Sequence, residues 1–176
     1  SEMCIRDRIM ASETTAAAAG AVGVVRRDPM AMLPFCGYNM GDYFGHWLEM
    51  GEKLGDKAPK IFHVNWFRTD DEGNFLWPGF GDNMRVLLWI LARCEGKVSA
   101  RETEIGYLPY VKDIDIEGLE NDGKEFTHMM LDELLSVDKA LWREDAENIE
   151  GFYTSIGERL PAKLWEELET LKKNLE

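Results

Sequence analysis

The 176-residue chain lacks the features that mark membrane-spanning, disulfide-rich and zinc-binding proteins. No run of about eighteen apolar residues occurs, so we expect no membrane-spanning helix. Only three cysteines are present, far apart and without a histidine at metal-ligand spacing, so we expect neither a disulfide framework nor a zinc site. The opening decapeptide SEMCIRDRIM has no apolar signal-peptide core, and we therefore expect a cytoplasmic protein.

The short motifs of common catalytic centres are also missing. No GxxxxGK[ST] phosphate-binding loop occurs, and Gly79-Phe80-Gly81 lacks the third glycine of a dinucleotide-binding fingerprint. Neither HExxH nor CxxC is found, and no serine lies in a nucleophile-elbow context. We therefore predict no catalytic residue and no metal ligand in this chain, which by itself shows a binding surface.

Positive charge is scarce, and the formal net charge is −13. Residues 111–176 carry 18 acidic and 8 basic side chains, a net charge of −10, whereas residues 1–110 carry −3. A negative field repels nucleic acid, so we expect no DNA or RNA partner. The acidic C-terminal part is interpreted as a solvated helical surface.

At 45% hydrophobic residues, the chain has enough apolar side chains for one globular domain. Residues 1–9 show no periodicity and no turn pattern, and we expect them to be a non-native leader. The domain is therefore assigned to residues 10–176. The small residues of 11–25 allow two interpretations, a segment that orders and disorders or a short helix that leads into a strand.

Hydrophobic periodicity predicts helices over residues 39–53, 83–93, 125–135, 139–151 and 160–175. Asp82 is the expected N-cap of the second helix. In the last helix, Leu160, Leu164, Leu168, Leu171 and Leu175 form one apolar stripe, which indicates a docking face; a coiled-coil partner is the alternative. Residues 99–115 are expected to be irregular.

Rings are concentrated in residues 61–83, IFHVNWFRTDDEGNFLWPGFGDN. The pattern predicts a buried strand over 61–67, a turn over 68–74 and a second short strand over 75–77. Aromatic faces beside a glycine-flexed corner and a helix N-terminus suit a flat, hydrogen-bonding ring such as a purine. Alternatively, the rings simply form a core. They are Phe62, His63, Trp66, Phe67, Phe75, Trp77 and Phe80.

Three runs of sequence resemble the C-terminal part of GTP-dependent phosphoenolpyruvate carboxykinase. They are RRDPMAMLPFCGYNMGDYFGHWL, PKIFHVNWFRTDDEGNFLWPGFGDNMRVLLWI and IGYLP. The resemblance covers residues 10–176 and is strongest over 26–93. It implies an α/β fold, namely the helix-dominated C-terminal portion of the carboxykinase nucleotide-binding domain with a small mixed sheet.

The resemblance also implies an activity. That family of lyases converts oxaloacetate and GTP into phosphoenolpyruvate, GDP and carbon dioxide, a decarboxylation used in gluconeogenesis, with Mn²⁺ and Mg²⁺ as metals. Phe67 and Phe80 match the pair of rings that sandwiches guanine, and Phe75 matches a third ring of the pocket. The loop that hydrogen-bonds the base edge is matched by Phe80, Gly81, Asp82 and Asn83.

Residues 14–24 match the mobile Ω-loop lid of the family. The resemblance implies that lid closure keeps water from the enolate formed by decarboxylation, and small side chains make its anchoring weak. The expected lid comprises Glu13, Thr14, Thr15, Ala16, Ala17, Ala18, Ala19, Gly20, Ala21, Val22, Gly23 and Val24.

The family's phosphate loop, metal-binding residues and oxaloacetate-binding arginines match nothing in these 176 residues. We therefore interpret the chain as an incomplete nucleotide-binding domain that is inactive alone, from a parent enzyme expected to be monomeric. Two alternatives stay open: a stand-alone, non-catalytic guanine-nucleotide-binding module, and an inert helical domain with an aromatic core.

Overall fold

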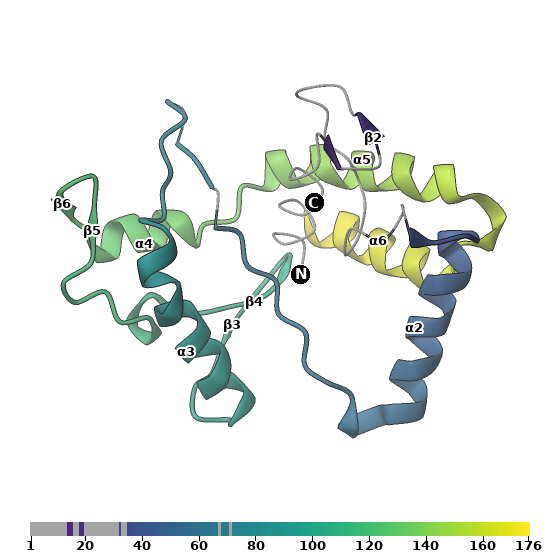
Figure 1. Cartoon of the computed structure of the whole chain (residues 1–176), viewed down its shortest axis with the longest axis horizontal. Coiled ribbons are helices and arrows are strands. Elements are labelled where there is room, and N and C mark those ends of the chain that lie inside the picture. The colour runs from purple at the N-terminus through teal and green to yellow at the C-terminus, as the bar shows by residue number, and fades with distance from the viewer. Residues whose placement is uncertain (1–13, 16–17, 20–31, 33–34, 67, 71) are drawn as a thin grey trace. The chain divides into compact units, whose positions relative to one another are not determined.

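The computed structural model describes residues 14–15, 18–19, 32, 35–66, 68–70 and 72–176. The chain forms two compact units, of which one is built around Val64–Val137. The other joins the preceding part of the chain, up to His63, to Asp138–Glu176. Helices dominate both units, and the strands are short (Figure 1).

The second of these units contains the three longest helices of the described residues, α2 (Met40–Leu54), α5 (Lys139–Ile156) and α6 (Ala162–Asn174). Two single-turn 3-10 helices, η3 (Gly55–Lys57) and η6 (Gly157–Arg159), follow α2 and α5. The prediction of a helix over 39–53 is thus confirmed. The helix predicted over 139–151 continues to Ile156, because the exposed Gly151 is tolerated and the chain turns only at Gly157, with φ +83°.

The start of α2 is attached to the segment that joins α5 to α6. Asn39 caps α2 by accepting a hydrogen bond from the Gly41 N–H at 2.7 Å, and its amide donates to the Ile156 carbonyl at 3.1 Å. An added Cβ at Gly41 would collide with the Arg159 carbonyl, so only glycine fits this approach. Buried Met40, Phe44 and Leu160 form the core of this contact.

Helices α5 and α6 pack against each other along the leucine stripe, which confirms the docking face predicted from the sequence. Leu160, Leu168 and Leu175 are buried. Tyr153 of α5 and Trp165 of α6 meet edge to face with centroids 5.4 Å apart. The stripe therefore packs within the chain, and no coiled-coil partner is needed to cover it.

The unit Val64–Val137 contains helices α3 (Asn83–Cys94) and α4 (His128–Leu134) and the 3-10 turns η4 (Phe80–Asp82) and η5 (Val111–Asp113). Two antiparallel hairpins lie between the helices, β3 (Arg101–Thr103) with β4 (Gly106–Leu108), and β5 (Glu120–Asn121) with β6 (Lys124–Glu125). Its buried apolar side chains are Trp77, Trp89, Ile114, Ile116, Leu119, Phe126, Leu131 and Leu134.

Three predictions within the stretch 61–135 are wrong or incomplete. No strand occurs over 61–66, because a β-rich run becomes a strand only within a ladder, and no ladder among the described residues includes it. Residues 99–115, expected to be irregular, contain the β3–β4 hairpin. The helix predicted from 125 begins at His128, because residues 120–125 form the β5–β6 hairpin around Asp122-Gly123.

The helix-dominated α/β class is confirmed. Where a small mixed sheet was expected, the described strands form three separate two-stranded antiparallel sheets. The third pair joins β1 (Thr14–Thr15) to β2 (Ala18–Ala19), inside the predicted lid. The remaining lid residues (Glu13, 16–17 and 20–24), like the expected leader 1–9, lie outside the described residues.

Helix α3 begins and ends close to the predicted limits, but its apolar side chains are only partly covered. Trp89 is buried, whereas Met84, Leu87, Leu88 and Leu91 are exposed at helical spacing.

Within the described part of the chain, no helix combines the length and the apolar character that a membrane crossing requires.

Candidate functional site

The predicted base-binding residues that the structure describes lie at the corner of the chain between the turn before Phe75 and the start of α3, in the unit Val64–Val137. Phe75 is 55% exposed, and Phe80 is 94% exposed. Gly81 is exposed, and the side chains of Asp82 and Asn83 are partly buried. Phe67 lies outside the described residues, so the pairing of its ring with Phe80 stays a prediction.

A tight turn precedes this corner, as the sequence predicts. Thr69 and Phe75 form an antiparallel bridge, and the Leu76 N–H donates to the Arg68 carbonyl at 2.8 Å. Gly73, with φ +87°, supplies a conformation that other residues rarely adopt. The predicted second strand over 75–77 is reduced to this single bridge, but the hairpin-like return of the chain is confirmed.

The Asp70 carboxylate holds the turn together. It accepts hydrogen bonds from the Glu72 N–H at 3.0 Å, the Asn74 N–H at 2.8 Å and the Asn74 side-chain amide at 3.0 Å. The Asn74 side-chain amide is the main cause that lowers the pKa of Asp70 below its usual value, and the backbone N–H groups add to it. The carboxylate is therefore a structural acceptor and not a proton donor near neutral pH.

Two polar side chains join this turn to the rest of the unit. The Arg68 guanidinium donates to the carbonyls of Leu134, the last residue of α4, at 2.8 Å and of Ser136 at 3.0 Å. The Asn121 amide donates to the Phe75 carbonyl at 3.0 Å. The backbone at Phe75 is thus fixed, although its ring is more than half exposed.

A glycine corner places Phe80 on the surface. Gly79 has φ +112°, a conformation in which L side chains are strained, and η4 begins directly after it. The Asp82 N–H donates to the Gly79 carbonyl at 3.1 Å, which closes the turn. The Phe80 ring therefore projects from a turn whose backbone is hydrogen-bonded.

Asp82 occupies the N-cap position of α3, as predicted, but its side chain makes no capping hydrogen bond. Its backbone has φ −105° and ψ 0°, outside the extended region in which a capping carboxylate reaches the helix N–H groups. The carboxylate instead binds the Arg85 Nε at 3.1 Å. Asp82 thus stabilises the corner through an arginine one turn further along the helix.

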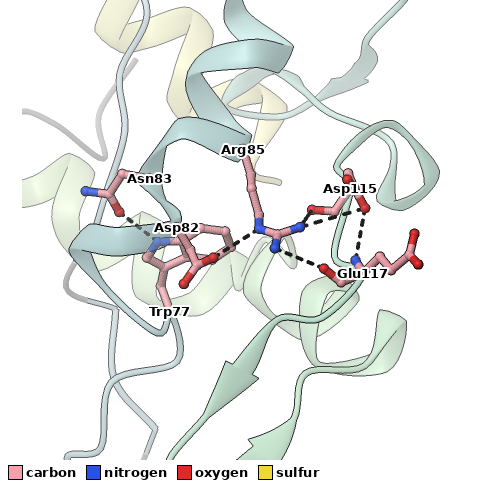
Figure 2. Close-up of polar contacts among 6 residues, drawn as sticks. All are labelled: Trp77, Asp82, Asn83, Arg85, Asp115 and Glu117. Carbon is pink, nitrogen blue, oxygen red and sulfur yellow. Dashed lines mark hydrogen bonds and ion pairs between the residues drawn. The ribbon is translucent and has the colours of Figure 1, made fainter.

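Arg85 fixes the corner to a distant loop (Figure 2). Besides Asp82, its guanidinium donates to the Asp115 carbonyl at 2.9 Å and the Glu117 carbonyl at 3.0 Å. The side chain is 22% exposed, and the five N–H groups of a guanidinium suit several acceptors at once. The role of Arg85 was not predicted from the sequence, where its i, i+3 spacing from Asp82 is the local signal.

Trp77 provides the second fixed contact of the corner. Its indole N–H donates to the Asn83 Oδ1 at 2.9 Å, as Figure 2 shows. The ring is 2% exposed and lies against Phe126, with centroids 6.0 Å apart at 79°, and against Trp66, with centroids 6.4 Å apart. From the sequence, Trp77 was expected only as one of the seven rings, and this hydrogen bond was not predicted.

The described residues contain no group of three or more His, Cys, Asp or Glu side chains that could hold a metal ion. A surface hollow of about 310 Å³ is present elsewhere in the unit, and none of the predicted base-binding residues that the structure describes lines it. Its walls are formed by Arg101, Pro109, Tyr110, Val111, Lys112 and Asp132.

Chemically, the corner offers an exposed phenyl face, a fixed side-chain amide and the first N–H groups of α3. A phenyl face stacks on any flat ring, whereas an amide distinguishes hydrogen-bond donors from acceptors. These groups suit recognition of a heterocyclic base. They include no nucleophile and no paired acid and base.

The matched family is described as the phosphoenolpyruvate carboxykinase C-terminal P-loop domain, and its model covers residues 4–174. The match begins inside the segment 1–9 that we expected to be a leader. The relatives include proteins named phosphoenolpyruvate carboxykinase [GTP]. The protein from Corynebacterium kroppenstedtii is 48% identical over 167 residues, which are 95% of this chain and 26% of that protein.

The relatives from Paenarthrobacter aurescens and Renibacterium salmoninarum are each 53% identical over 94% of this chain. The chain spans about a quarter of the length of these relatives, 27% in both cases. Because the family model covers nearly the whole chain, the chain belongs to the GTP-dependent phosphoenolpyruvate carboxykinase family.

Proposed function

We propose that this chain forms the guanine-binding corner of an enzyme that converts oxaloacetate and GTP into phosphoenolpyruvate, GDP and carbon dioxide. The observation that carries the proposal is the position of Phe80, which is 94% exposed beside Asn83 at the start of α3. Membership of the family supports the choice of guanine as the base. Phe67, Phe75, Phe80 and Asn83 are the residues proposed to contact it.

The frame around Phe80 supports a binding role. Arg85 binds the backbone carbonyls of Asp115 and Glu117, and Trp77 holds the Asn83 side chain. A site ordered in advance loses less conformational entropy on binding, so more of the stacking energy remains as affinity. Stacking of a base on an aromatic side chain contributes about 1–3 kcal/mol. An exposed ring on a fixed turn is therefore well suited to a base.

The proposal also assigns the other parts of the enzyme, namely the phosphate and metal sites, the oxaloacetate site and the lid. The relatives are about three and a half times as long as this chain, and the phosphate loop, the Mn²⁺ and Mg²⁺ ligands and the oxaloacetate-binding arginines are proposed to lie in that remaining length. Residues 13–24 are proposed to form the lid. We further propose that the parent enzyme is a cytoplasmic monomer and that the chain alone has no carboxykinase turnover.

Calorimetric titration of the 176-residue chain with GDP and with ADP tests the base site. We expect tighter binding of GDP than of ADP. Phe80→Ala should weaken GDP binding by about 1–3 kcal/mol, which is roughly fivefold to more than a hundredfold. Because the Phe80 ring is almost fully exposed, this substitution should leave the unfolding transition unchanged.

Tyr107→Ala is the matched control, since Tyr107 is an exposed ring on β4 of the same unit. It should change neither GDP affinity nor stability. Equal binding of GDP and ADP, or equal GDP affinity of the two variants, would contradict the proposed site. Selective binding of GDP by a protein whose reading frame encodes only these 176 residues would instead favour a stand-alone guanine-nucleotide-binding module.

A further inference from the structure

The hydrogen bond between Trp77 and Asn83 determines which way the Asn83 amide faces. The indole N–H is only a donor, so the atom that lies 2.9 Å from it must be the amide oxygen and not the nitrogen. This removes the usual ambiguity between the O and N atoms of an asparagine amide. The Nδ2 group therefore lies on the side away from Trp77, as Figure 2 shows.

This orientation is fixed by the core of the unit. Trp77 is buried, and its ring contacts those of Phe126 and Trp66. A flipped amide would place an N–H₂ group against the indole N–H and leave a buried donor without an acceptor, which is unfavourable. Asn83 also lies in the first turn of α3, which the Arg85 contacts hold to residues 115 and 117.

Asn83 consequently presents a hydrogen-bond donor, because its Oδ1 already accepts from Trp77. Its Nδ2 has no hydrogen-bond partner among the described residues. Guanine carries an acceptor oxygen at position 6, whereas adenine carries a donor amino group there. A fixed donor at this point favours a 6-oxopurine and leaves two donors facing each other when adenine enters.

We propose that Trp77 is a positioning residue for base selectivity: it holds Asn83 as a donor toward the 6-oxo group of a purine nucleotide. This inference rests on the proposed guanine site and adds a determinant that lies in the core below it. A 6-oxopurine without the 2-amino group of guanine presents the same acceptor oxygen to this donor. Inosine diphosphate therefore serves as a probe beside GDP and ADP.

Calorimetry of the full chain with GDP, IDP and ADP tests the inference. Wild-type protein should bind GDP and IDP similarly and both more tightly than ADP. Trp77→Phe keeps a buried ring but removes the N–H, and should reduce the GDP-to-ADP affinity ratio by about two- to tenfold. Trp89→Phe is the matched control, a buried tryptophan of the same unit, and should leave the ratio unchanged.

Two variants of Asn83 separate its hydrogen bond to Trp77 from its contact with the base, and they test the inference even if Trp77→Phe does not fold. Asn83→Asp keeps an oxygen acceptor for the indole but has no N–H donor. It should preserve the Trp77 indole N–H signal in a proton–nitrogen NMR spectrum and lose the preference for GDP and IDP. Asn83→Ala should shift that signal and accelerate exchange of the indole proton.

The outcomes distinguish the two levels of the proposal. A wild-type chain without preference for GDP over ADP would overturn the guanine site and this inference with it. Guanine preference that persists unchanged in both Trp77→Phe and Asn83→Asp would overturn only the positioning role. So would IDP binding as weak as that of ADP, or an indole signal that Asn83→Ala does not move.

Discussion

The corner around Asn83 and the α5–α6 hairpin are held together by different means. In the hairpin, leucines recur along α6 and pack against α5, with Leu168 and Leu175 buried. In the corner, long polar side chains donate to backbone carbonyls far away in sequence, as Arg85 does to residues 115 and 117. The hairpin is stabilised mainly by apolar burial, to which Arg143 of α5 adds hydrogen bonds to the Leu175 carbonyl at 3.0 and 2.7 Å. In the corner, hydrogen bonds fix the side chains of Asp82 and Asn83 beside the buried Trp77.

The difference has a consequence for function. Apolar packing tolerates conservative exchange of one hydrophobic residue for another, since it has no direction. A guanidinium bound to three acceptors has a defined geometry, and lysine cannot reproduce it. We therefore expect the directional hydrogen bonds of the corner to fix the positions of Phe80 and Asn83 for a ligand. The apolar packing of the hairpin contributes mainly to the free energy of unfolding.

The largest expected effect lies in the hairpin. Leu168 is 3% exposed, and Leu168→Ala should lower the free energy of unfolding by about 2–5 kcal/mol through lost burial and a cavity. Leu141→Ala in α5, at a side chain that is 54% exposed, is the control and should change it by less than about 0.5 kcal/mol. Urea unfolding measures both; equal effects would show that the stripe does not carry the hairpin.

A smaller and more local effect is expected in the corner. Arg85→Ala removes donors to Asp82, Asp115 and Glu117, and should destabilise the corner by about 1–3 kcal/mol. Hydrogen exchange should rise in residues 115–119 and 80–84 while α5 and α6 keep their protection. Arg93→Ala is the control, since Arg93 makes one 3.4 Å contact to the Val98 carbonyl. Unchanged exchange at 115–119 would contradict the role of Arg85.

The aspartates at the N-termini of α5 and α3, Asp138 and Asp82, differ in the same way as the two regions. Asp138 caps α5 by accepting from the N–H groups of Ala140 at 2.8 Å and Leu141 at 3.1 Å. Asp138→Ala should therefore cost about 1 kcal/mol, and Asp138→Asn should restore most of it. At Asp82, which makes no cap, asparagine should not rescue, because the partner is the charged Arg85. Urea unfolding of Asp138→Ala, Asp138→Asn, Asp82→Ala and Asp82→Asn measures these differences in the free energy of unfolding. Equal rescue by asparagine at both positions would contradict the different roles of the two aspartates.

The smallest effect concerns pH. The pKa of Asp70 is lowered in the folded chain, so its contribution to stability is present above the pKa of the unfolded state. It is lost as the pH falls through the lower folded value. Asn74→Ala should move the pKa of Asp70 back toward its usual value, because the Asn74 amide is the main cause of the shift. A carboxyl-carbon NMR titration that shows no change would contradict this.

Helix positions could be predicted because they depend on periodicity. The helices predicted over 39–53 and 83–93 correspond to α2 and α3 within one residue at each end. The β5–β6 hairpin was missed although its signal is local: Asp122 and Gly123, with φ 51° and 72°, are the two-residue turn that Asp-Gly favours. The strand predicted over 61–67 does not form over its described residues 61–66, because β-propensity depends on the context of a sheet.

The candidate site could be predicted only in part. Asn83 and Asp82 were identified from the resemblance, but the directions of their side chains depend on Trp77 and Arg85. The contact of Arg85 with residues 115 and 117 spans about thirty positions of sequence and follows no repeat. Only the folded chain brings these groups together, so the donor role of Asn83 could not be derived from composition or spacing.

The central claim is that guanine stacks between the rings of Phe67 and Phe80. The most direct test is an NMR measurement on the chain with labelled phenylalanine rings and bound GDP. The account predicts an upfield ring-current shift of the guanine H8 proton and nuclear Overhauser effects from it to the ring protons of both residues. GDP binding without either contact would contradict the claim.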